Sequence, residues 1–119
     1  MVSLIRLLTQ GEIEANITKL SELLEEETYT YARQSEASAE AESDYKVLMA
    51  RAIVTFLNDR GLKMTQYERQ ARCDLICSDE FRVWKMAEAR RSSTKEALLT
   101  LRSRLDAMRT LSANVRHAT

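Results

Sequence analysis

Hydrophobic residues recur at steps of three and four along the first half of the chain. Alternating steps of this kind place one face of a helix against another helix, as in a coiled coil. Three polar residues, Glu27, Gln34 and Ser38, fall in the same phase and make the middle of this line weakly apolar. The pattern predicts one helix over about residues 10–59, with its apolar seam at Ile13, Ile17, Leu20, Leu24, Tyr31, Ala41, Tyr45, Leu48 and Ala52.

Helix-starting and helix-stopping signals divide the chain into two halves. The segments Thr9–Glu12 and Thr65–Glu68 both have the capping-box pattern, in which a threonine and a glutamate satisfy the first free amides of a helix. Between them, Asp59-Arg60-Gly61 resembles a helix end with a glycine cap. We therefore expect an N-terminal arm at 1–9 and a helical domain at 10–119, with its turn near 60–65.

A second helix is predicted from residue 65 to about Asn114. Between residues 67 and 81 the apolar phase slips, and beyond it the three-and-four spacing returns. Folding the two helices back on each other sets Leu105 opposite Leu20 and Met108 opposite Ile17. The expected fold is all-α, an antiparallel hairpin of two long helices with coiled-coil-like packing. Its second seam is Trp84, Ala87, Arg91, Thr94, Leu98, Leu101, Leu105, Met108 and Val115.

Composition supports long helices and self-association. The 119 residues include no proline and only two glycines, whereas sheet folds need more turn residues. A chain of this size with very long helices buries a modest core. We therefore expect a homo-oligomer, held together, like the hairpin itself, by the residues of the second seam: Trp84, Leu98, Leu101, Leu105, Met108 and Val115.

The formal net charge of zero hides two halves of opposite sign. Residues 1–59 carry five Lys and Arg against eleven Asp and Glu, whereas residues 60–119 carry thirteen against seven. The two halves therefore either attract each other or leave a basic surface for nucleic acid. The strongest pattern is a heptad-spaced line, the basic stripe, which faces either another subunit's carboxylates or phosphates: Lys95, Arg102, Arg109 and Arg116.

A second group of cations, the turn cluster, surrounds the expected turn: Arg51, Arg60, Lys63, Arg69 and Arg72. Phe56 and Tyr67 lie among these residues in the sequence. Cations beside aromatic rings suit a single strand, because bases stack on the rings while phosphates are neutralised. Phe56 has the simpler expected role of closing the end of the hairpin, and Trp84 that of a core residue.

Enzyme, metal and membrane signatures are absent from the sequence. It has no phosphate-binding glycine loop, no HExxH and no EF-hand motif. Cys73 and Cys77, with His117, do not form a zinc pattern, and two cysteines one helical turn apart suit a disulfide poorly. We expect a cytoplasmic, non-enzymatic protein with reduced thiols, no cofactor, no metal and no membrane span.

Two segments resemble phage recombination mediators of the UvsY type. In "LMARAIVTFLNDRG", Ala50 and Arg51 match the family's basic segment, Phe56 its aromatic position and Arg60-Gly61 its turn, whereas Met49 stands where the family has lysine. Near the end, "RLDAMRTLSANVR" resembles the terminal helix of that family. Trp84 lies roughly where the family has an aromatic pair.

This resemblance implies a single-stranded-DNA-binding protein that forms ring-like oligomers. It would help a RecA-class recombinase to displace single-strand-binding protein, and it would act in the host cytoplasm as a viral protein. The turn cluster would then hold phosphate. The alternative from the residues alone is a structural coiled-coil adaptor, for phage assembly or host interaction, without a nucleic-acid role.

Overall fold

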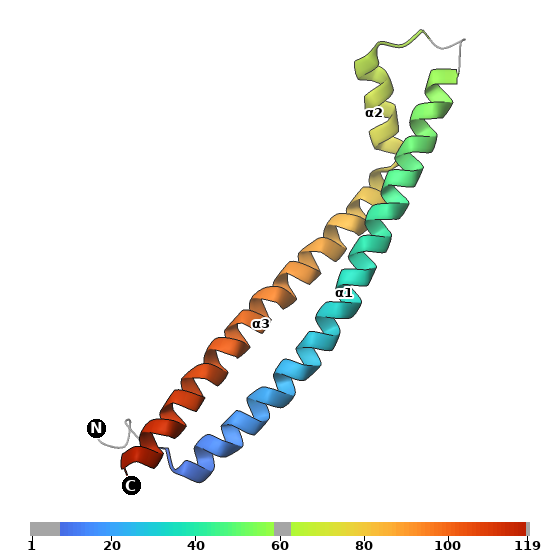
Figure 1. The fold of residues 1–119 in the computed structure, drawn as a ribbon. Helices are drawn as coiled ribbons and strands as arrows, with labels where there is room; N and C mark the ends of the chain where they lie inside the picture. The colour runs from blue at the N-terminus through green and yellow to red at the C-terminus, as the bar shows by residue number, and fades with distance from the viewer. Residues whose placement is uncertain (1–7, 59–62, 119) are drawn as a thin grey trace. The chain divides into compact units, whose positions relative to one another are not determined.

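The computed structural model describes residues 8–58 and 63–118, and nearly all of these residues are helical. Helix α1 spans Gln10–Asn58, α2 Gln66–Ile76 and α3 Ser78–Ala118, and no strand occurs among these residues (Figure 1). The all-α prediction is confirmed. Most of the predicted arm at 1–9, and the stop signal with Arg60 and Gly61, lie outside the described residues.

Both helix starts follow from their capping threonines. The backbone N–H of Glu12 donates to Thr9 Oγ1 at 3.2 Å, and that of Glu68 donates to Thr65 Oγ1 at 3.1 Å. Each bond satisfies an amide that has no partner in the first turn of a helix. Helix α1 accordingly begins at Gln10 and α2 at Gln66, as the sequence predicts.

The predicted second helix is two helices, because the chain leaves helical geometry at Cys77. The cap residue has φ −97° and ψ 10°, and the hydroxyl of Ser78 donates to the carbonyl of Leu75 at 2.9 Å. A serine hydroxyl that bonds a nearby carbonyl competes with the helical ladder. Asp79 and Glu80 then supply the negative charge that favours the start of α3.

The chain divides into two compact units. The terminal unit joins residues 8–31 to residues 93–118, and the central unit consists of residues 32–92 apart from the undescribed 59–62. Each unit therefore combines a part of α1 with a part of the second half of the chain.

In the terminal unit, the start of α1 lies beside the end of α3 (Figure 1). Gln10 Nε2 donates to Ser112 Oγ at 2.9 Å, and Leu24 lines one pocket with Leu105. The two segments therefore run in opposite directions. Met108 shares another pocket wall with Leu20, one seam position from its predicted partner. Ile13, Leu98 and Leu105 are buried, and Leu101, Met108 and Val115 are half-buried.

In the central unit, α2 packs on α1 through small residues and aromatic rings. Ala52, Cys73 and Cys77 form a buried cluster, against which Tyr45, Leu48, Met49 and Phe56 pack. Burial continues at steps of three and four through Cys73, Cys77, Glu80 and Trp84. The apolar phase slips at Leu75 and Ile76, as the sequence indicates, but these side chains are 75% and 51% exposed and the buried seam does not slip.

Candidate nucleic-acid interface

The basic stripe lies on α3 in the terminal unit. Lys95, Arg102, Arg109 and Arg116 are all exposed. Because they recur every seven residues, they share one side of the helix, next to the buried line of Leu98 and Leu105. The structure therefore brings all four predicted stripe residues onto one flank.

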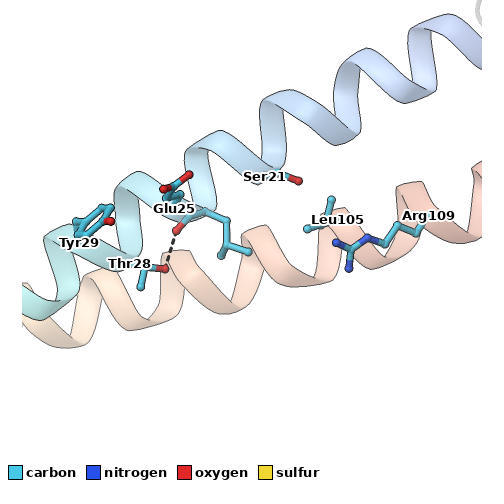
Figure 2. Close-up of a pocket in the computed structure, with 7 residues that line it drawn as sticks. Ser21, Glu25, Thr28, Tyr29, Leu105 and Arg109 are labelled. Carbon is cyan, nitrogen blue, oxygen red and sulfur yellow. Dashed lines mark hydrogen bonds between the residues drawn. The ribbon is translucent and has the colours of Figure 1, made fainter.

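Arg109 shows what faces the stripe across the two segments. Figure 2 shows Arg109 and Leu105 projecting from α3 beside Ser21, Glu25 and Thr28 of α1. These side chains line a shallow pocket of about 490 Å³. The Thr28 hydroxyl is occupied locally, because it donates to the carbonyl of Leu24 at 2.7 Å. The wall opposite Arg109 thus carries three hydroxyls, those of Ser21, Thr28 and Tyr29, and a single carboxylate.

The counter-charges found for Lys95, Arg102 and Arg109 among the described residues are weak. Arg109 Nη1 lies 3.8 Å from Asp106 Oδ1, one turn back on its own helix, and the two side chains are 61% and 76% exposed. Exposed pairs of this kind contribute little free energy, since water screens both charges. Lys95 and Arg102 make no ion pair with another described residue. These cations remain available to an anionic ligand.

The turn cluster lies in the central unit, where most of it is solvent-accessible. Arg51, Lys63 and Arg72 are exposed, whereas Arg60 lies outside the described residues. Arg69 is half-buried: it lines a groove of about 380 Å³ with Phe56 and Cys73, and its buried Nε has no hydrogen-bond partner among the described residues. Arg69 therefore differs from the others in being partly committed to packing.

The three aromatic residues considered from the sequence have different environments. Phe56 packs against the central cluster, and Trp84 stacks on Tyr45 with ring centroids 5.3 Å apart while Lys85 Nζ lies 4.2 Å from the Trp84 ring. Both rings are engaged within their unit. Tyr67 is 84% exposed at the start of α2. Of these three, Tyr67 is the ring open to a base.

An aromatic group that the sequence did not predict surrounds Trp84. Phe81 meets Tyr45 edge-on at 5.4 Å and Trp84 at 5.9 Å. Edge-on rings are favourable because the positive edge of one meets the negative face of the other. The step of three from Phe81 to Trp84 is the signal that the sequence offered for this group, which consists of Tyr45, Phe81 and Trp84.

Two groups in the central unit have shifted pKa values. A hydrogen bond and the positive charge of Lys46, whose Nζ lies 2.7 Å from Glu42 Oε1, lower the pKa of the Glu42 carboxyl. Burial raises the pKa of the Cys77 thiol, and the neighbouring Glu80 carboxylate adds to the shift. Cys73 and Cys77 are both buried and free. The Cys77 thiol therefore stays neutral at physiological pH.

Metal-ligand clusters and membrane-spanning helices are absent from the residues that the structure describes. Within residues 8–58 and 63–118, His, Cys, Asp and Glu do not gather into a group able to hold a metal ion. No helix in that part of the chain is long and apolar enough to cross a membrane. No family model, curated protein or solved structure matches the chain.

Proposed function

We propose that this protein is a non-enzymatic, single-stranded-DNA-binding protein of the recombination-mediator kind. The observation that carries the proposal is the basic stripe, a line of exposed cations on one flank of α3. Among Lys95, Arg102 and Arg109, the ion pair found within the described residues is the exposed 3.8 Å pair between Arg109 and Asp106. Lysine and arginine bind a phosphate backbone by releasing condensed counterions, and this attraction is independent of base sequence.

The turn cluster supplies a second anionic contact region with a stacking ring. Arg51, Lys63 and Arg72 are exposed, and Tyr67 offers an aromatic face in the same unit. A single strand exposes both phosphates and base faces, so it can use both kinds of group. Duplex DNA offers only the first. This combination favours a single strand as the ligand.

Each chain offers few cations, so the proposed mechanism is avidity. Several copies assembled on one strand multiply weak contacts into stable binding without a new kind of contact. Within each unit, the seam of α1 would pack against the seam of the second half of the chain as in an antiparallel coiled coil. The hairpin over residues 10–119 stays a prediction. Action with a RecA-class recombinase against single-strand-binding protein is the part of the proposal that comes from the family resemblance.

The test is fluorescence anisotropy of labelled single-stranded DNA with the whole protein and a stripe variant, Lys95→Ala, Arg102→Ala and Arg109→Ala together. The variant is expected to weaken binding by about tenfold or more, because three phosphate contacts are lost.

The matched control removes three positive charges that lie outside the stripe. It is Lys19→Ala, Lys46→Ala and Arg82→Ala; Lys46 and Arg82 are already paired with Glu42 and Asp79. If both triple variants weaken DNA binding equally, the loss of affinity depends on net charge alone, and the stripe is not a binding site. Loss of helicity in the stripe variant, monitored by circular dichroism, identifies unfolding as the cause.

The second candidate is a structural adaptor without a nucleic-acid role. It is favoured by exposed apolar side chains in the central unit, among them Leu57 at 63%, Val54 at 54% and Val47 at 48%. Such side chains need a protein partner rather than a phosphate. Absence of DNA binding at low salt would leave this candidate alone.

A further inference from the structure

Helix α1 carries a second line of mostly apolar residues in the central unit, which we name the back face: Ser43, Val47, Ala50, Val54 and Leu57. Each of the first four lies two residues beyond a position of the buried seam Ala41, Tyr45, Leu48 and Ala52, which is about 200° around the helix. The back face therefore points away from the packing between α1 and α2. All five of its residues are exposed.

The back face has one hollow end and one protruding end. Ala39, Ser43, Val47 and Ala50 line a shallow hollow of about 420 Å³, with Glu42 and Lys46 at its rim. Val54 and Leu57, further along the helix, are large and more than half exposed. The small residues thus come first along the chain and the large ones last.

The charges along one edge of the back face also differ between its two ends. Asp44 and Arg51 are seven residues apart, so they lie on the same side of the helix, and both are exposed. Neither makes an ion pair with another described residue. A negative charge therefore flanks the hollow end and a positive charge flanks the protruding end.

We propose that the back face pairs with the back face of a second copy of this chain, with the two α1 helices antiparallel. A two-fold axis near residues 48–49 sets Val47 opposite the partner's Ala50 and Val54 opposite the partner's Ser43. The protruding end of each copy then fills the hollow end of the other. Asp44 of each copy meets the partner's Arg51, which gives two symmetric ion pairs.

The pairing is specific for a second copy because shape and charge match under the same rotation. Self-complementarity of one patch is the defining property of a two-fold interface, and large residues opposite small ones allow close packing. A parallel pair in register would set hollow on hollow and Val54 on Val54, and it would not bring Asp44 to the partner's Arg51. The antiparallel arrangement is the one that fills the space and neutralises the charges.

The interface is small, so the dimer is a reversible one. The back face covers 15 residues of helix, about 22 Å in length, which is less than a standard stable protein interface requires. The inference shares Arg51 with the turn cluster but involves neither DNA nor the basic stripe. Its test therefore uses the whole protein without nucleic acid, and its failure leaves the DNA titration above unaffected.

The first experiment is sedimentation equilibrium over a concentration series. The wild-type chain is expected to rise from its monomer mass of 13.7 kDa to twice that value. Val54→Glu is expected to weaken the dimer more than about 100-fold, because each interface would bury two unpaired carboxylates. Val83→Glu is the matched control, since Val83 is 56% exposed in the same unit but lies on α3; it should dimerise as the wild type does.

Two outcomes of this experiment would overturn the proposal. A wild-type chain that stays at 13.7 kDa throughout the series has no such dimer. Equal dissociation of Val54→Glu and Val83→Glu would place the contact on another surface. Circular dichroism on both variants separates dissociation from unfolding, because both replaced valines are exposed and folding should survive either change.

The second experiment tests the antiparallel register through its charges. Asp44→Arg alone and Arg51→Asp alone each set like charges opposite one another at two symmetric places, and each is expected to weaken the dimer about tenfold. The double variant restores both pairs with reversed signs and should recover the wild-type dissociation constant within about threefold. A double variant as weak as either single one would exclude this register.

Discussion

Both units bury residues at steps of three and four along their helices, but they differ in the size of the buried side chains and in the apolar side chains left exposed. The terminal unit buries branched aliphatic side chains, Ile13, Leu98 and Leu105, whereas the central cluster is built on Ala52, Cys73 and Cys77. Of the fourteen large hydrophobic side chains that are exposed in the described residues, ten belong to the central unit. The central unit therefore leaves more of its apolar side chains exposed than the terminal unit does.

This difference agrees with the two proposals, which place DNA binding in the terminal unit and self-association in the central unit. The terminal unit presents the basic stripe and little apolar surface, as a polyanion site requires. The central unit presents the back face of α1, as self-association requires. Small buried residues explain part of the contrast, because a core of alanine and cysteine brings helices close but removes little apolar area from water.

The largest expected effect comes from the core of the terminal unit. Leu105→Ala should lower the free energy of unfolding by about 2–4 kcal/mol, because it leaves a cavity beside a side chain that is only 4% exposed. Leu99→Ala, on the same helix but 47% exposed, should change it by less than about 0.5 kcal/mol. Urea unfolding followed by circular dichroism measures both, and equal losses would contradict the assigned core.

A smaller effect is expected at the exposed ring of the central unit. Tyr67→Ala should weaken single-stranded-DNA binding by about fivefold or more, since base stacking on one aromatic side chain contributes about 1–3 kcal/mol. Tyr67→Phe keeps the ring and should keep the affinity. If the two variants bind alike in the anisotropy titration, Tyr67 does not stack on a base and the stripe alone carries the ligand.

The smallest effect concerns pH. Burial raises the pKa of Cys77 above the ordinary 9.0, so the folded chain holds its thiol proton more tightly than the unfolded chain does. The resulting stability is present below pH 9.0 and is lost as pH rises through the folded pKa.

Urea unfolding between pH 8 and 10 measures this loss, with Cys77→Ala as the control. The slope against pH should be shallower in Cys77→Ala, because that variant lacks the titrating thiol. An identical slope in both proteins would mean that Cys77 is not protected. Such a result would mean that water reaches the Cys77 thiol, in contradiction to its buried position in the structure.

The sequence predicted the elements that depend on local chemistry. Thr9 and Thr65 start helices because their hydroxyls accept specific backbone amides, and this can be recognised without a structure. The seam of α1 was also predictable, including the buried Ser38, because a three-and-four spacing fixes which positions face inwards whatever the residue type.

The single helix predicted from residue 65 to about Asn114 was wrong. The structure also buries Cys73 and Cys77 and leaves Leu75 and Ile76 exposed, which the sequence did not predict. The helix break at Cys77 depends on the Ser78 hydroxyl reaching the Leu75 carbonyl, which no hydrophobic pattern encodes. In the candidate interface, the spacing predicted the stripe, but the engagement of Trp84 with Tyr45 and Lys85 required the structure.

The most direct measurement of the central claim is the salt dependence of single-stranded-DNA binding by the wild-type protein. Three phosphate contacts per chain predict that affinity falls roughly 20-fold between about 50 and about 200 mM salt, with a logarithmic slope of about −2. The stripe variant should lose most of that slope. No binding at the lower salt concentration, or a slope that the stripe variant leaves unchanged, would contradict the assignment of the stripe to phosphate.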